Sequence, residues 1–236
     1  CANAARQLFE GVVFVRLLLV SVLFAGFLVL AQGALGIGGG GFMPVLYFPD
    51  LSALNAELSA HGFGGFSRPL PLWGGGGFGG LLSGPRLGGM GYGGEISVRR
   101  GEKTATLSFS AGGFLTERAL FAEGNMALGF GLLLGGGSAE LELIFRAPSS
   151  FEEALATPTS TRLSRGFFAL EPYLTLELFL FDWAFLKVQV GYLLALGDGW
   201  KAGGFDLGGV PASLSAPVLH FFVNFGGYAS LTEETP

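Results

Sequence analysis

The sequence predicts an all-β fold, namely an antiparallel up-and-down (meander) β-barrel of eight to ten strands, with a short N-terminal helix after a signal peptide. Three observations support this prediction. Several segments alternate apolar and polar side chains with a period of two, which is typical of strands. The links between these segments alternate between tight turns and longer loops. Each segment is about ten residues long, which is the length of a strand in such barrels.

The composition excludes several classes of protein. The chain has 236 residues, of which 50% are hydrophobic and 42 are glycine. This apolar content excludes a disordered chain, and glycines without a three-residue period exclude collagen. The formal net charge is −5 and the 13 basic residues form no dense cluster, which argues against a nucleic-acid partner. Cys1 is the single cysteine, so an intramolecular disulfide, a cysteine-rich metal site and a catalytic thiol are excluded.

The N-terminal segment has the pattern of an export signal. Arg16 precedes the apolar run Leu17–Leu30, and small residues follow at Ala31 and Gly33. This order predicts a secretory signal peptide within residues 1–33, cleaved after Gly33. The alternative is a single membrane anchor, although the run is shorter than the roughly 20 residues that a spanning helix needs.

Residues 34–68 predict a weak strand, GALGIGGGGFMPVLYF, followed by a short helix. Asp50 is a suitable N-cap and Gly62 a suitable end for this helix. Three leucines share one face of it: Leu51, Leu54 and Leu58. We expect the helix either to plug the lumen or to close one mouth of the barrel; the alternative is a helix packed outside on a sheet edge.

The barrel itself is predicted over residues 69–228, and its first clear hairpin is GEISVRRGEKTATLSFS. The preceding glycine-rich runs are weaker strands, because glycine lowers strand propensity. A two-residue turn at Gly101 and Glu102 fits a type II′ hairpin. This turn pairs polar residues with one another: Arg99 with Thr104, Ser97 with Thr106, and Glu95 with Ser108.

The segment NMALGFGLLLGGGSAELELIF predicts a second hairpin, with its turn at the three glycines 135–137. Leucine and phenylalanine side chains fill one face of the first half. In the second half, Glu140 and Glu142 point away from the apolar face. We therefore expect both glutamates on a polar face of the barrel wall.

The segment LEPYLTLELFLFDWAFLKVQVGYLLAL predicts a third hairpin rather than a helix. Each half has one wholly apolar and one mixed face, and FDWA is a turn signal. A turn centred on Asp182 places Glu177 opposite Lys187, as a cross-strand ion pair. A membrane helix would instead expose these charges to lipid, at a high cost.

The last predicted strand is PVLHFFVNFGG, and a tail follows at 229–236. Between the strands, the links 197–215 and 147–166 are long, and the link 119–124 is intermediate. The tight turns alternate with these links: Asp182, 135–137 and 100–103. All tight turns would then lie at one end of the barrel, as in transmembrane β-barrels.

These hairpins, the export signal and the closing strand LHFFVNFGG resemble those of the small outer-membrane β-barrel proteins, over roughly residues 69–228. The resemblance implies an exported outer-membrane protein with a structural, adhesive or lipid-facing role. It also implies membrane lipid as the partner, and no wide pore at eight strands. Nothing in the sequence identifies a partner protein. Three tryptophans are candidates for interfacial girdles or for the core: Trp73, Trp183 and Trp200.

Polar residues on the predicted strands are candidates for a network that lines the lumen. Small barrels fill their interior with side chains, and buried charges must be paired. We therefore expect the carboxylates to pair with basic residues; a cation site or an acid–base site is the alternative for the glutamates. The predicted network comprises Glu95, Arg99, Arg118, Glu140, Glu142, Glu177, Lys187, Gln189, His220 and Asn224.

No motif predicts an enzyme, a cofactor or a metal. GIGGGG and GMGYGG both match the pattern GxGxxG, but neither lies between a strand and a helix. The alternative function is a secreted or periplasmic soluble β-barrel or sandwich that binds an apolar ligand. The two hypotheses differ in which way the apolar strand faces point: outward to lipid, or inward to a core.

Overall fold

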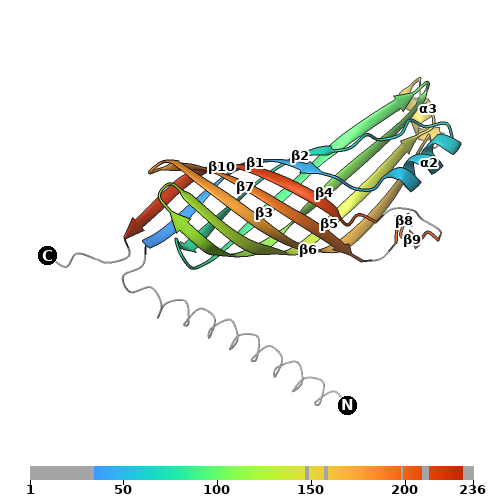
Figure 1. Cartoon of the computed structure of the whole chain (residues 1–236). Helices are drawn as coiled ribbons and strands as arrows, with labels where there is room; N and C mark the ends of the chain where they lie inside the picture. Colours follow the sequence, from blue (N-terminus) through green and yellow to red (C-terminus); the bar gives the residue numbers. More distant parts are fainter. Residues whose placement is uncertain (1–34, 147–148, 157–158, 198, 209–212, 231–236) are drawn as a thin grey trace, which may run out of the picture.

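The computed structural model describes residues 35–146, 149–156, 159–197, 199–208 and 213–230. The predicted signal peptide and almost all of the tail lie outside these residues. In the described part, eight long strands close into one antiparallel ring, which confirms the predicted up-and-down barrel (Figure 1). The ring strands are β1 (Leu35–Tyr47), β2 (Leu70–Leu81), β3 (Pro85–Arg100), β4 (Lys103–Glu123), β5 (Met126–Ile144), β6 (Ser160–Phe181), β7 (Ala184–Leu196) and β10 (Ala216–Ser230).

The long strands follow one another around the ring in chain order. β1 pairs with β10, and this pairing closes the barrel. The link between β7 and β10 contains a two-stranded hairpin, β8 (Lys201–Ala202) and β9 (Phe205–Asp206). Strand β8 of this hairpin pairs with β6. Two short helices lie in the longer links: α2 (Ser52–Ala60) between β1 and β2, and α3 (Phe151–Ala156) between β5 and β6. The weak strand expected before the helix is therefore a member of the ring.

The two ends of the barrel differ. The turn end carries the short links 82–84, 124–125 and 182–183, together with the start of β1 and the end of β10. The loop end carries the links that contain α2, α3, β8 and β9. Figure 1 shows these helices and the small hairpin together at the right, opposite the start of β1 and the end of β10. The tight turn 101–102 also belongs to the loop end.

The predicted hairpin at glycines 135–137 is wrong, because β5 runs straight through them. Each glycine is paired on both sides, Gly135 for example with Gly113 of β4 and Ala169 of β6. A Cβ atom at Gly137 would overlap with the ring of Phe167, so glycine permits close packing here. The real turn lies at Gly124, which has a φ of 58°. Because residues 126–144 form one strand instead of the predicted two, β3 and β4 run in the opposite direction to the prediction. The turn 101–102 therefore lies at the loop end.

The other two predicted registers are confirmed. Arg99 lies opposite Thr104, and Ser97 opposite Thr106, in the β3–β4 hairpin. Glu177 lies opposite Lys187 in the β6–β7 hairpin. Polar pairs that match across neighbouring strands therefore identified both registers from the sequence.

Strands β3 to β6 extend beyond the rest of the barrel at the loop end. Pairing between β2 and β3 stops at Trp73 and Gly93, whereas β3 continues to Arg100. We call this projecting part of β3–β6 the extension. It is a four-stranded sheet, joined at its β6 edge by β8.

The segment 48–69, which contains α2, packs against the inward side of the extension. Leu54 and Leu58 are buried in the same apolar cluster as inward side chains of the strands. Gly64 lies against Val98, an inward residue of β3, and Lys103 Nζ donates to the carbonyl of His61 at 2.7 Å. Of the two expected placements, the structure has the helix at the barrel mouth rather than on an outer sheet edge.

Local hydrogen bonds define both ends of this helix. The N-cap is Leu51 rather than the expected Asp50, which lies one residue earlier and accepts a hydrogen bond from the Ser52 N–H at 3.1 Å. The hydrogen bond from Ser52 also lowers the pKa of the exposed Asp50 carboxyl. Gly62 follows the helix with a φ of 79°, a conformation that glycine adopts without strain.

Candidate functional site: the buried polar network and the outer surface

Nine polar or charged side chains are buried inside the barrel. They occupy the half of the lumen between the middle of the barrel and its turn end. They come from five strands, and each is at most 2% exposed. Burial of this kind requires that charges be paired and that polar atoms be hydrogen-bonded. The nine residues are Arg86, Glu117, Glu171, Thr175, Glu177, Lys187, Gln189, His220 and Asn224.

Four of these side chains form a cluster that we call the ion cluster: Arg86 of β3, Glu117 of β4, Glu177 of β6 and Lys187 of β7. Arg86 Nη1 lies 3.0 Å from Glu117 Oε1 and 2.7 Å from Glu177 Oε1. Lys187 Nζ lies 2.6 Å from Glu117 Oε2 and 3.4 Å from Glu177 Oε1. Two positive and two negative charges therefore cancel, and they connect strands on different sides of the lumen.

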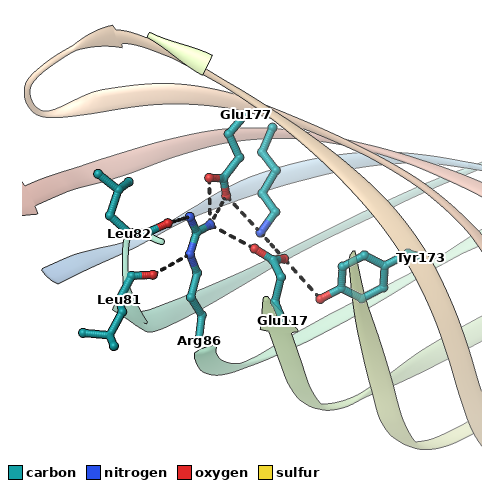
Figure 2. Close-up of polar contacts among 7 residues, drawn as sticks. Leu81, Leu82, Arg86, Glu117, Tyr173 and Glu177 are labelled. Carbon is teal, nitrogen blue, oxygen red and sulfur yellow. Dashed lines mark hydrogen bonds and ion pairs between the residues drawn. The ribbon is translucent and has the colours of Figure 1, made fainter. Parts of the chain in front are cut away.

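The remaining donors of the ion cluster are also satisfied (Figure 2). Arg86 Nε donates to the carbonyl of Leu81 at 3.1 Å, and its Nη2 donates to the carbonyl of Leu82 at 2.8 Å. The hydroxyl of Tyr173 donates to Glu117 Oε2 at 3.3 Å. Such complete pairing is what allows a buried ion cluster to be tolerated.

A second group lies further along the lumen and joins β3, β6 and β10. His220 Nε2 lies 2.7 Å from Glu171 Oε1, and the Tyr92 hydroxyl donates to Glu171 Oε2 at 2.7 Å. Glycine at position 191 leaves room for this carboxylate, since a Cβ there would lie 3.1 Å from Glu171 Oε1. Glu171 thus has a partner on each oxygen.

The predicted lumen residues divide into two sets. The structure places Glu177, Lys187, Gln189, His220 and Asn224 inside the barrel. The other five lie on the outer surface, contrary to the expectation: Glu95, Arg99, Arg118, Glu140 and Glu142. All but Arg118 belong to the extension, where polar residues point outward and apolar residues point inward.

The sequence analysis missed the residues that complete the network, notably Arg86, Glu117 and Glu171. A signal for two of them exists in the period-two pattern. Glu117 continues the apolar face that contains Leu107 and Phe109, and Glu171 shares a face with Glu177. Arg86 lies directly opposite Glu117 in the β3–β4 hairpin, so continuing the predicted register of that hairpin along both strands would have identified it.

The outer surface of the section around the buried network is apolar. Large hydrophobic side chains alternate with the inward polar residues, and they are 40–60% exposed. Seven of the eight ring strands contribute such a residue, for example Phe42, Trp73, Phe114, Leu128, Leu174, Val190 and Phe221. We call this surface the apolar band.

Aromatic side chains lie at the edges of the apolar band. At the turn end, Trp183 stacks on Phe181 with ring centroids 5.5 Å apart and on Phe225 at 6.2 Å. Toward the extension, Trp73 stacks on Phe42 at 5.5 Å. Trp200, by contrast, is only 2% exposed and belongs to the core. Two of the three tryptophans therefore lie at the edges of the apolar band, and the third lies in the core.

The extension reverses this polarity. Its outer face carries hydroxyl and charged groups, including the hydrogen-bonded pairs Ser97–Thr106 at 2.8 Å and Ser110–Ser138 at 3.1 Å. Arg162 lies 3.8 Å from Glu140 on the same face. Its inner face carries Leu107, Phe109 and their apolar neighbours, which pack under the segment 48–69.

Within the described residues, no group of three or more histidine, cysteine, aspartate or glutamate side chains is placed to hold a metal ion. In the same part of the chain, none of the helices combines the length and hydrophobicity required to span a membrane.

No family model and no curated protein sequence matches this chain. The solved structures that are similar to it include two of one protein. One is Ail, the attachment invasion locus protein of Yersinia pestis, in complex with the heparin analogue sucrose octasulfate, with 10% identity, a TM-score of 0.43, and coverage of 84% of this chain and 99% of that chain. The other is Ail alone, with the same identity and coverage and a TM-score of 0.41. The barrel architecture described above rests on the strand pairing of this chain itself.

Proposed function

We propose that the chain is an exported outer-membrane β-barrel protein with a structural, adhesive or lipid-facing role and no wide pore. The observation that carries this proposal is the direction of the side chains around the ion cluster. There the charged residues point into the lumen and large apolar residues point outward. Water would penalise such an outer surface, whereas the hydrocarbon core of a membrane favours it.

The geometry of the strands fits the same proposal. A closed antiparallel ring leaves no unpaired strand edge within the apolar band, as the absence of water in lipid requires. The aromatic stacks at Trp183 and Trp73 fit the two interfaces of the bilayer. The turn end has only short links, and all the long links lie at the loop end beside the tight turn 101–102, which fits a periplasmic turn end and an external loop end.

The filled lumen supports the absence of a wide pore. The ion cluster lies across the interior near the turn end, and inward side chains such as Met43 and Leu133 are fully buried further along it. The segment 48–69 covers the loop-end mouth. Passive diffusion of solutes would require these packed groups to move aside.

A soluble apolar-ligand binder would need the large apolar faces inside. The outward direction of Leu174, Val190 and Phe221 is the reverse of that arrangement, with each of these side chains at least 40% exposed. The extension does have an apolar interior, but α2 and its neighbouring segment fill it.

The test is whether the folded state requires a membrane-like environment. The chain is refolded from urea with and without detergent or phospholipid vesicles, and unheated and boiled samples are compared on a gel. We expect a heat-dependent mobility shift only with detergent or lipid. A water-soluble monomer that shows no such shift would refute the proposal.

A further inference from the structure

One outward side chain, Arg118 of β4, places a charge on the apolar outer surface of the barrel. It is exposed, and it lies directly opposite Pro85 of β3 and Phe130 of β5. The preceding residue, Glu117, points inward and belongs to the ion cluster. Because successive side chains of a strand point to opposite faces, the barrel wall separates Arg118 from the lumen carboxylates with which the sequence analysis paired it.

The surroundings of Arg118 are hydrophobic. Leu120 and Phe121 follow it toward the turn 124–125, and Phe114 precedes it toward the extension. Phe130 lies beside it on the neighbouring strand. Each of these four side chains is at least 45% exposed. The guanidinium group therefore leaves the wall among large side chains that would contact lipid.

Charge is otherwise rare on this surface. Outside the extension, the outward positions of the described ring strands carry two charged residues, Arg118 and Glu123. Glu123 is the last residue of β4, beside the turn 124–125. None of the ion pairs between described residues includes Arg118. In a membrane, its charge needs a partner that none of the described side chains provides.

The position of Arg118 along the barrel determines what this partner can be. The N–H of the next residue, Ala119, donates to the carbonyl of Gly84 in the turn 82–84, at 3.4 Å. Arg118 therefore lies beside a turn, near the edge of the apolar band. From such a position a long arginine side chain reaches the membrane interface while its aliphatic stem stays among apolar groups.

We propose that Arg118 binds the phosphate of a phospholipid headgroup in the bilayer leaflet at the turn end. The planar guanidinium is always charged and fits two phosphate oxygens at once. The apolar neighbours of Arg118 contact the acyl chains of the same leaflet, so one site receives both parts of the lipid. This inference rests on the proposed membrane location and adds a specific lipid contact to it.

The test compares the folded full chain in two kinds of vesicle, one of phosphatidylglycerol and one of a galactolipid that has no phosphate. Urea titrations give the folding equilibrium constant of the wild type and of Arg118→Leu in each. In phosphatidylglycerol, we expect Arg118→Leu to lower this constant about fivefold, the contribution of one arginine near an anionic membrane surface. In the galactolipid, we expect no loss or a gain, because the substitution removes a charge that no phosphate balances.

The matched control is Arg100→Leu, since Arg100 is an exposed arginine at the loop-end tip of β3, far along the extension. Its effect should be the same in both kinds of vesicle. The inference is overturned if Arg118→Leu also has the same effect in both. A chain that folds in neither kind of vesicle refutes the proposed function itself.

A direct measurement on the wild type decides the question if Arg118→Leu does not refold. Carbon–phosphorus dipolar dephasing in solid-state NMR, with isotope-labelled arginine in phosphatidylglycerol vesicles, reports contact between a guanidinium carbon and a lipid phosphate. We expect one dephased guanidinium signal, and we expect it to be missing in Arg118→Lys. A folded barrel without this signal refutes the phosphate contact and leaves the proposed function standing.

Discussion

At the scale of single residues, the position of a charge decides its energetic role. Lys187 and Arg162 both pair with two glutamates, but Lys187 is 1% exposed and Arg162 is 65% exposed. Removing one partner of a buried pair leaves an uncompensated charge, whereas exposed pairs contribute little. The two residues therefore provide a matched comparison.

We predict that Lys187→Met lowers the free energy of unfolding by about 3–5 kcal/mol, because Glu117 and Glu177 then share one cation. Adding Glu177→Gln should restore most of the loss, since the Arg86–Glu117 pair remains. The control Arg162→Met should change stability by less than about 1 kcal/mol. Urea titrations of the folded barrel in lipid measure all three. An equal loss of stability in Lys187→Met and Arg162→Met would contradict the role of the ion cluster.

Glycines of β3 differ in how much room surrounds them, depending on whether they face the lumen or the outer surface. A Cβ atom at the inward Gly88 would overlap with the carbonyl oxygen of Gly77. At the outward Gly91, the nearest atom would be the carbonyl oxygen of Ala111, at 3.7 Å. Close backbone approach therefore requires glycine at the first position and not at the second.

We predict that Gly88→Ala prevents folding or strongly destabilises the barrel, whereas Gly91→Ala is neutral or stabilising by up to about 1 kcal/mol. The fraction of heat-modifiable protein after refolding in detergent reports both effects. Efficient folding of the Gly88→Ala variant would show that the strands do not approach one another as closely as described.

At the scale of elements, α2 is held by packing rather than by its own sequence. Its leucines face the interior of the extension, and Asn55 exchanges two hydrogen bonds with the backbone of Phe66, at 2.8 and 2.9 Å. A helix of nine residues is too short to be stable alone in water. These contacts therefore hold α2 at the loop-end mouth.

We predict that Leu54→Cys and Leu58→Cys are protected from a water-soluble thiol reagent, and that Glu57→Cys on the exposed face is labelled rapidly. The measurement uses the folded protein with Cys1 replaced by serine. Rapid labelling at Leu54 or Leu58 would mean that the helix does not cover the lumen, whereas unfolding in urea should expose all three sites.

At the scale of the whole molecule, the outer surface changes from apolar to polar where the extension begins. Leu174 and Ser108 both point outward, but Leu174 lies in the apolar band and Ser108 in the extension, where its hydroxyl donates to Glu95 at 3.3 Å. For the proposed membrane barrel, this change marks one boundary of the bilayer.

We predict that Leu174→Arg costs about 2–4 kcal/mol of folding free energy in phospholipid vesicles, the range for arginine at the bilayer midplane. Ser108→Arg should cost no more than about 0.5 kcal/mol, as expected for a surface position. Reversible urea titrations in vesicles measure the difference. A similar cost at both sites would place the membrane elsewhere, or would indicate that the barrel does not span it.

The sequence by itself determined the elements that depend on local patterns. Period-two alternation predicted the strands, and matched polar pairs predicted two registers, because cross-strand neighbours are set by the turn between them. It failed at Gly135–Gly137, where glycines typical of a turn instead permit close packing inside a strand. Local propensity does not distinguish these two uses of glycine.

Only the tertiary structure decided which face of each strand points inward, and at what height along the barrel. Glu140 and Glu177 both lie on strands with alternating faces, yet one is on the outer surface and the other is in the ion cluster. The reason is physical: closure of the ring brings the Arg86–Glu117 pair of the β3–β4 hairpin against the Glu177–Lys187 pair of the β6–β7 hairpin. In the extension, the same period-two alternation of the strands buries leucine and phenylalanine side chains and places charged side chains on the outer surface.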